Sequence, residues 1–392
     1  MCESSPFRAV SRVCWIFLSG LVACGGSTGV ANGDPSTVER SDPRGTPPPS
    51  DGAGGCHDLL PAPLGPPVEE QFEQPEEFAC WGAPVIDGEG HLAFDFFSSP
   101  FQSASWRVLD SAGTTIGHFG GPRLVSIYPQ QDGFMGIPYP EADFVPLSLN
   151  SWSSTGALLG STVVTSGRSY AVVAALDPGG GVLVFRTESL GTDERQLVAQ
   201  RYDQHAVARG PALPITALRG DESTAGTVDR LGLSLVVYDE LPGSDVACFL
   251  GRWIRTDGTP LGDPFFIYQG PIRSYGSLQL APLIGGGVAV SVEGRWVARI
   301  PSGRPHALPP PHWLTGRPPS LLPIVRGGRA YAIPVPTAEG EQPQIELVTA
   351  QGRSCGRFTL PTPARSVTIG RDGTVAEELN YCHYQWWPQL LE

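Results

Sequence analysis

The sequence predicts an all-β fold made of many short strands, and two observations carry this prediction. Gly and Pro account for 49 and 40 of the 392 residues, and only 17% of the chain is charged. That composition favours short strands joined by turns over long helices, and a hydrophobic content of 41% argues against a disordered chain. The second observation is a glycine-bearing turn that returns along the chain at a regular interval.

The repeat starts after Gly82 and places a glycine turn before a short apolar or alternating strand seven times. The turns contain Gly88, Gly133, Gly180–Gly181, Gly232, Gly286–Gly287, Gly328 and Gly373. Successive turns lie 42 to 54 residues apart, which is too regular for unrelated loops. A second strand follows in most units; these strands start at Trp106, Trp152 and Trp253, with weaker copies at Trp296 and Ile345.

A period of about 40–50 residues that holds about four short strands is typical of a β-propeller blade. Residues 80–392 resemble β-propeller repeats, although they match none of the named blade motifs. We therefore predict a propeller of about seven blades in residues 68–392. A pair of β-sandwiches with coincidental turns is the competing interpretation.

The end of the chain predicts how the ring closes. After "YCHYQWWPQLL" the chain stops before another glycine turn and outer strand, so the last blade is incomplete. An open sheet edge invites aggregation, so a strand from elsewhere has to complete this blade. Val68–Trp81 precedes the first full unit and is the candidate. The prediction is six complete blades and one composite closing blade.

The N-terminus has the pattern of an export signal. Arg8 and Arg12 precede the apolar run Val13–Ala23, which is too short to span a bilayer as a helix but suits a signal-peptide core. The run ends in Leu21-Val22-Ala23-Cys24, which resembles the lipobox of bacterial lipoproteins. A buried strand that ends at a chance cysteine is the alternative.

The lipobox resemblance implies cleavage after residue 23 and lipidation of Cys24 by several acyl chains, which together hold a protein durably on a membrane. Gly25 follows the cysteine where many inner-membrane lipoproteins have Asp, so the outer membrane is favoured. Residues 24–67 then form a flexible Gly/Pro/Ser-rich tether. Its Gly25–Gly29 segment matches the GxSxG pattern of hydrolases but lacks the strand and helix which that motif requires.

Five cysteines remain after the lipidated one, an odd number in an oxidising compartment. They are candidates for up to two disulfides: Cys56, Cys80, Cys248, Cys355 and Cys382. Cys80 with Cys382 would join the two ends of the ring, whereas Cys56 with Cys80 and Cys355 with Cys382 would be more local. The sequence leaves these pairings open.

Composition excludes several function classes. The formal net charge of −13 disfavours nucleic acid or an anionic membrane surface as a partner. All 26 cations are Arg, so phosphate-binding loops that need a Lys and Schiff-base chemistry are excluded. The seven His residues show no metal-ligand spacing, and the sequence singles out no metal ligand, no cofactor and no catalytic residue.

Aspartates near glycine turns are expected to cap backbone groups; they are Asp87, Asp95, Asp110, Asp132, Asp257, Asp263 and Asp372. A carboxylate pair across the propeller mouth would instead serve a glycosidase. Trp106, Trp152, Trp253 and Trp296 are expected to pack between blades.

Two further segments have two interpretations each. Trp386-Trp387 falls outside the repeat and forms either a carbohydrate-stacking surface or the seal of the closing blade. The proline-rich segment Pro305–Pro323 interrupts the repeat and is either a stiff connector or a segment read by a partner protein.

The leading hypothesis is a lipid-anchored, non-enzymatic binding or scaffolding module at the cell envelope, with a protein or glycan ligand at one mouth of the ring. The alternative is an extracytoplasmic propeller enzyme, a hydrolase or lyase, that acts on glycans. Two carboxyl groups about 5–9.5 Å apart in an open cleft would favour the enzyme.

Overall fold

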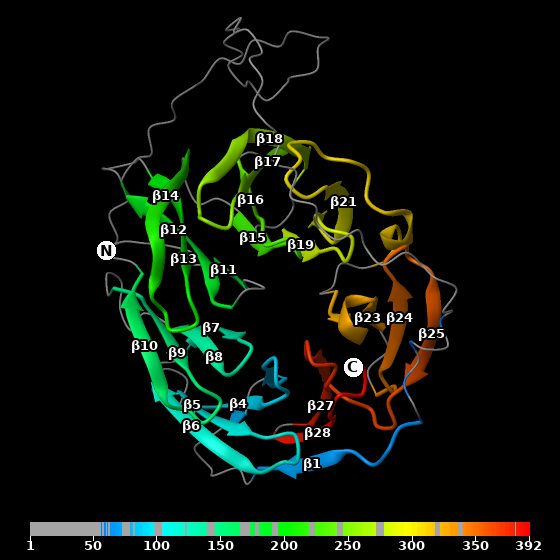
Figure 1. Cartoon of the computed structure of the whole chain (residues 1–392). Coiled ribbons are helices and arrows are strands. Elements are labelled where there is room, and N and C mark those ends of the chain that lie inside the picture. Colours follow the sequence, from blue (N-terminus) through cyan, green and yellow to red (C-terminus); the bar gives the residue numbers. More distant parts are fainter. Residues whose placement is uncertain are drawn as a thin grey trace, which may run out of the picture. The chain divides into compact units, whose positions relative to one another are not determined.

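In the computed structural model, seven antiparallel sheets form a seven-bladed β-propeller (Figure 1). The described residues are 56, 59, 61, 63–72, 79–80, 83–97, 104–121, 124–138, 146–164, 173–176, 180–189, 195–218, 224–240, 246–271, 278–317, 322–335, 340–380 and 382–392. The predicted signal peptide and Cys24 lie outside them. Within this part of the chain, no helix is long and apolar enough to cross a membrane.

Seven antiparallel sheets follow one another along the chain, and the innermost strands of most neighbouring sheets contact each other. Blade one has β2 (Ala79–Cys80), β3 (Val85–Ile86), β4 (Leu92–Phe97), β5 (Ala104–Leu109) and β6 (Thr115–Gly121). Blade two has β7 (Leu124–Pro129), β8 (Phe134–Pro138), β9 (Ser148–Trp152) and β10 (Leu158–Val163). Blade three has β11 (Val173–Leu176), β12 (Val182–Ser189), β13 (Arg195–Tyr202) and β14 (Ala208–Leu218). Blade four has β15 (Thr224–Val228), β16 (Ser234–Asp239), β17 (Val246–Ile254) and β18 (Pro260–Pro271).

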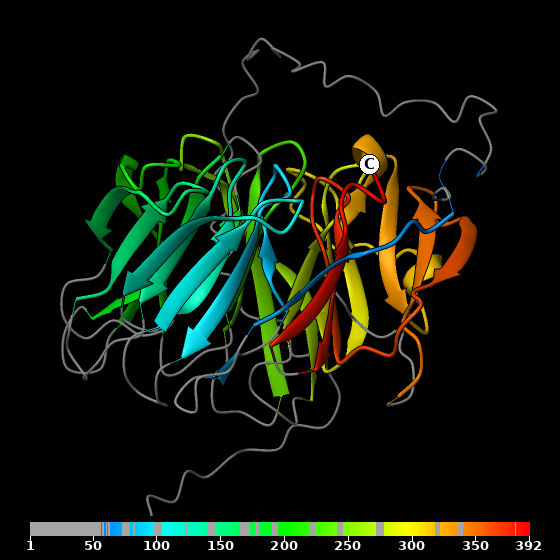
Figure 2. The same cartoon turned by 90° about the horizontal axis from the view of Figure 1, so that it is seen from below.

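The remaining blades close the ring, which is seen edge-on in Figure 2. Blade five has β19 (Gln279–Pro282), β20 (Val288–Val292) and β21 (Arg295–Ile300). Blade six has β22 (Ile324–Val325), β23 (Ala330–Val335), β24 (Gln344–Thr349) and β25 (Ser354–Thr359). Blade seven has β26 (Ser366–Ile369), β27 (Val375–Asn380), β28 (His383–Trp387) and β1 (Val68–Gln71). Two 3-10 turns, η2 (His312–Leu314) and η3 (Arg326–Gly328), complete the described elements.

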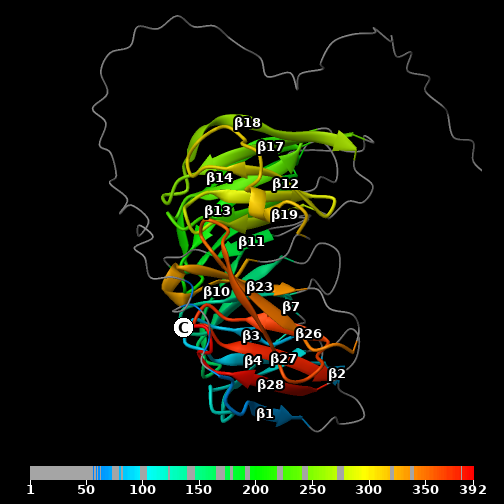
Figure 3. The ribbon, with the colours of Figure 1, turned by 90° about the vertical axis from the view of Figure 1, so that its right-hand side faces the viewer.

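The predicted composite blade is confirmed. β1 pairs antiparallel with β28 as the outer strand of blade seven, with Val68 opposite Trp386 and Gln71 opposite His383. Figures 1 and 3 show β1 alongside β28. The N-terminal strand therefore covers the edge that the C-terminal hairpin would otherwise expose.

Blade five departs from the expectation of six complete blades. Its described sheet has three strands, and where a fourth strand would pair, Leu308 forms an isolated antiparallel bridge with Arg299. Leu308 belongs to the proline-rich segment, and proline lacks the N–H that a continuous ladder requires. The outer position of this blade is therefore taken by a connector.

The seven predicted glycine turns all join the first strand of a blade to its second strand. Gly133 and Gly287 show why glycine is required, because both have positive φ (97° and 87°). A Cβ at Gly133 would lie 2.2 Å from the carbonyl oxygen of Trp152, and one at Gly287 would lie 2.3 Å from that of Ile300. In both blades the turn contacts the third strand. Glycine is therefore required at these repeat positions both for its backbone conformation and because no side chain fits.

Each of the seven described core clusters lies between two neighbouring blades. The tryptophans that start the repeat strands are buried there, as predicted: Trp106, Trp152, Trp253 and Trp296. Trp386 and Trp387 are also buried, with exposed fractions of 0% and 4%. The structure therefore places this pair in the seal of the closing blade, and a carbohydrate-stacking role for it is wrong.

The end of the predicted tether packs on the propeller, which moves the start of the packed domain back from Val68 to Cys56. Leu59 is buried in the cluster between blades six and seven. Its carbonyl accepts a hydrogen bond from Nε of Arg326, and Nε1 of Trp387 donates to the carbonyl of Gly65. Leu59 is one of the few large apolar residues in this stretch. Its tertiary contacts offset the conformational entropy that is lost when the backbone becomes ordered.

Candidate functional site

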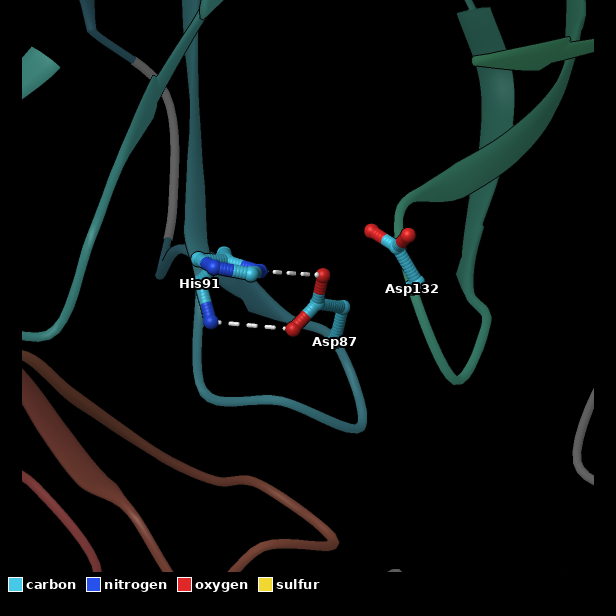
Figure 4. A group of neighbouring side chains, drawn as sticks. All are labelled: Asp87, His91 and Asp132. Carbon is cyan, nitrogen blue, oxygen red and sulfur yellow. Dashed lines mark hydrogen bonds and ion pairs between the residues drawn. The ribbon is translucent and has the colours of Figure 1, made fainter. Parts of the chain in front are cut away.

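Three titratable side chains, Asp87, His91 and Asp132, lie close together where the first turns of blades one and two meet (Figure 4). Asp87 follows β3 and is fully buried. Its Oδ1 accepts from the backbone N–H groups of Glu89 and His91, both at 2.9 Å. Its Oδ2 accepts from Nδ1 of His91 and from the backbone N–H of Gly133 in blade two, also at 2.9 Å. Asp87 thus shapes its own turn and fastens it to the next blade.

The same device recurs around the ring. Asp229 follows β15, accepts from the N–H groups of Leu231 and Leu233 through Oδ1, and reaches Gly287 of blade five through Oδ2 at 3.3 Å. Gln130 follows β7, and its Oε1 accepts from Gly181 of blade three at 2.7 Å. We call these three contacts the inter-blade staples. They link the end of one first strand to the second-strand turn of the next blade.

The Asp87 cluster also has the composition of a metal site, because ligand atoms of Asp87, His91 and Asp132 lie within 4.8 Å of one another. The hydrogen bonds decide against that role. Both oxygens of Asp87 already accept two N–H donors each, which use the lone pairs that a cation would need. The arrangement therefore fits an inter-blade staple, with Asp132 exposed beside it.

The cluster also bears on the glycosidase alternative. A catalytic carboxyl group has to reach substrate in an open cleft. Asp87 has 0% exposure and no free acceptor position, so it cannot be one of two such groups. The sequence expectation that Asp87 caps backbone is confirmed, as it is for Asp110, Asp257 and Asp372, whose carboxylates accept N–H bonds within their own turns.

We expect Asp87→Asn to destabilise the domain by about 1–3 kcal/mol, the usual cost of one buried donor left without an acceptor. The asparagine oxygen can keep the two bonds of Oδ1, but its NH2 group faces the N–H of Gly133. Asp110→Asn is the matched control, because Asp110 makes the same turn bonds through Oδ1 and, among the described residues, no bond to another blade. Denaturant unfolding at pH 7 measures both, and equal losses would contradict the inter-blade role.

A cavity of about 500 Å³ lies between blades five and six, on the same end of the ring as the glycine turns. The first turn of blade five supplies Leu283, Gly285 and Gly286, and the turn between β24 and β25 supplies Ala350, Gln351 and Gly352. The remaining lining residues are Arg299, Pro311, His312, Trp313 and Tyr331. We call this cavity the blade 5/6 pocket. Its volume lies within the range of small-molecule sites.

The proline-rich segment forms one wall of the blade 5/6 pocket, and its contacts hold it in place. Leu314 is fully buried in the cluster between blades five and six. Arg317 donates to both carboxylate oxygens of Glu346 at 2.8 and 3.1 Å, and its Nε donates to the carbonyl of Trp313. The hydrogen bond from Arg317 holds the pKa of the Glu346 carboxyl at about 2, so this pair stays ionised at neutral pH.

Trp313 and Tyr331 pack together at this wall, with ring centroids 5.0 Å apart. A Cβ at Gly352 would lie 2.2 Å from the indole of Trp313, so only glycine allows the indole its position. Tyr331 accepts a 2.6 Å hydrogen bond from the N–H of Ile284, and burial raises its pKa to about 12. These contacts fix the position of the wall, and the partly exposed indole lines the pocket.

The sequence pattern marks the proline-rich segment but not the pocket that it forms. Arg299, Tyr331 and Gln351 come from three strands or turns that are far apart in the chain. Each lies at an ordinary position of its repeat, so no local motif marks it. The interruption of the repeat between blades five and six was the one available signal.

Two of the candidate cysteines form a disulfide in the structure: Cys56 is bonded to Cys355 of β25, with a Cα–Cα distance of 4.8 Å. This bond rules out the local pairing of Cys56 with Cys80 and of Cys355 with Cys382. Cys248 and Cys382 each take part in a further disulfide, and Cys80 lies in β2. The pairing of Cys80 with Cys382 stays a prediction.

No family model matches the chain, and no curated protein matches it in sequence. Among solved structures it is similar to the polysaccharide lyase Uly1, at 8% identity and a TM-score of 0.48, over 78% of this chain and 89% of that one. It is also similar to a eukaryotic initiation factor (12%, 0.39, 82% and 93%) and to the Hadza microbial sialidase Hz136 (9%, 0.40, 72% and 73%). At such identities these similarities concern the fold alone.

Proposed function

We propose that this protein is a lipid-anchored β-propeller of the bacterial cell envelope that binds a ligand in the blade 5/6 pocket and catalyses no reaction. The lipobox-like Leu21–Cys24 segment supports the anchor, with Cys24 as the lipidated residue and the outer membrane as the favoured location. The tether then leads from the membrane to the packed segment at Cys56. A protein or a glycan is the class of ligand that this display fits.

The observation that carries the binding role is the chemistry of the pocket wall. Trp313 is anchored from both sides, by buried Leu314 and by the Arg317–Glu346 ion pair, so it is ordered before any ligand arrives. Preorganised aromatic groups favour binding because little entropy is lost on association. None of the described lining residues is a carboxylic acid, which is the group that glycoside hydrolysis needs in a pair.

Trp313→Ala should abolish the binding of envelope components that the wild-type chain retains. Immobilised full-length protein would be exposed to envelope extract and, separately, to a glycan array. Leu158→Ser is the matched control, because Leu158 is 61% exposed on β10, in a different blade. Capture that is equal for both variants would place the ligand elsewhere, and turnover of an array glycan would favour the enzyme alternative.

The anchor is tested independently. A chain expressed in a bacterial host should incorporate labelled palmitate and partition into the membrane, whereas Cys24→Ser should do neither. Retention of the label in the variant would contradict lipidation at Cys24.

A further inference from the structure

We propose that the blade 5/6 pocket recognises an acidic sugar residue, a uronate, with Arg299 binding its carboxylate and Trp313 stacking on its ring. This inference rests on the proposed binding function and specifies the chemical class of the ligand.

Arg299 is the unused cation of the pocket. Its side chain is exposed, lines the cavity, and makes no hydrogen bond or ion pair with the described residues. Its backbone is nevertheless fixed, because its N–H and carbonyl both bond to Leu308, at 2.8 and 2.9 Å. The neighbouring Arg317 is committed to Glu346 by contrast. Because the backbone of Arg299 is fixed and the N–H groups of its guanidinium are unused, this side chain suits bidentate binding of a carboxylate.

The local field favours an anion although the chain as a whole carries a net charge of −13. Arg299 and Arg230 both act on Tyr331 in the direction that lowers its pKa, against the larger effect of burial. Among the described residues that line the pocket, Arg299 is a cation and none is an acid. Oriented attraction of this kind selects anions among ligands of similar shape.

The backbone of the pocket argues against a phosphate as the anion. Phosphate sites in glycine-rich turns use free backbone N–H groups. Here the N–H of Gly286 bonds to the carbonyl of Leu283, that of Gly287 bonds to Asp229, and that of Gly352 bonds to the carbonyl of Thr349. With these donors occupied, the charged contact available to a ligand is the planar fork of Arg299.

The groups around Arg299 fit a sugar ring. The indole of Trp313 offers an apolar face to the C–H groups of a pyranose, and the exposed side chains of His312 and Gln351 can exchange hydrogen bonds with its hydroxyls. A carboxylate, hydroxyls and an apolar ring face occur together in a uronic acid.

The test is calorimetric binding of the full-length protein to galacturonate oligosaccharides and to galactose oligosaccharides of equal length. We expect the uronate to bind at least tenfold more tightly at low salt. Arg299→Gln should remove that preference, and Trp313→Ala should remove the binding of both. Arg295→Gln is the matched control, because Arg295 lies exposed on the same strand, β21, outside the pocket. Circular dichroism of each variant verifies that the fold is retained.

Equal affinity for both oligosaccharides, lost in Trp313→Ala and unchanged in Arg299→Gln, would overturn the acidic-sugar assignment and leave the proposed binding function standing. Competition by inorganic phosphate at a concentration similar to that of the uronate would also overturn it, in favour of a general anion site. If neither oligosaccharide binds, the assignment is wrong. The capture experiment with envelope extract then decides separately whether the pocket binds anything.

Discussion

A chain that begins at residue 73 should not fold to a stable propeller, whereas a chain that begins at residue 56 should. The first lacks β1 and therefore exposes the edge of β28, which carries Trp386 and Trp387. It also lacks Phe72, whose ring packs on Phe94 and Phe96 with centroids 5.1 and 4.9 Å apart. Loss of buried aromatic packing costs about 3–5 kcal/mol per residue, and the unpaired edge adds an aggregation hazard.

A third chain that begins at residue 68 separates the two parts of the N-terminal segment. It keeps β1 but loses Leu59, the bond of Trp387 to Gly65 and the Cys56–Cys355 disulfide. Thermal unfolding followed by circular dichroism, with light scattering for aggregation, should rank the chains by stability as 56, then 68, then 73. If the chain from residue 73 unfolds cooperatively at the same temperature as the chain from residue 56, ring closure by β1 is not required.

Glu377→Gln should stabilise the domain by about 3 kcal/mol at pH 8 and have little effect at pH 4. Glu377 lies fully buried in the middle of β27; one of its oxygens accepts from the amide of Gln385 and the other, Oε1, has no partner. Burial raises its pKa from 4.5 to about 7. Each pKa unit corresponds to about 1.4 kcal/mol, which gives the expected size of the effect.

The direction of this pH dependence follows from which state, folded or unfolded, keeps the proton on the Glu377 carboxyl. Between pH 4.5 and about 7 the unfolded chain has an ionised carboxylate, while the folded chain keeps the proton. The native state therefore binds more protons, and the stability of the wild type falls as the pH rises through this window. Glutamine does not titrate, so the variant should lack this fall.

Guanidinium unfolding at pH 4, 6 and 8 measures the effect of the Glu377→Gln substitution. Glu89→Gln, at an exposed position of the first turn, is the matched control for the substitution itself. A Glu377→Gln difference that is constant with pH would show that the carboxyl does not titrate in this range.

The repeat could be predicted from the chain because its cause is local. Gly133 and Gly287 need positive φ and direct contact with a third-strand carbonyl, and any other residue would add a Cβ within 2.3 Å of it. Selection for such turns leaves a regular spacing that can be counted. The buried repeat tryptophans could be predicted for the same reason, since each occupies an equivalent position in its own blade.

The staples and the pocket could be predicted only in part, because their partners come from different blades. Asp87 is recognisable as a turn residue, but its bond to Gly133 depends on the rotation between blades one and two. Trp386 is ambiguous in the sequence, because an aromatic pair outside the repeat is equally compatible with surface and core. The exposed fraction of 0% decides it.

By itself, the sequence predicted the all-β class, a ring of about seven blades and the use of the N-terminal strand to complete the last sheet. These features follow from backbone conformation and from the need to cover sheet edges, which act over a few residues at a time. Only the tertiary structure decided that Cys56 pairs with Cys355, that blade five ends in a bridge at Leu308, and that Arg299 and Trp313 share a pocket. Those features depend on distances between residues far apart in the chain, and distances are set only when the ring has closed.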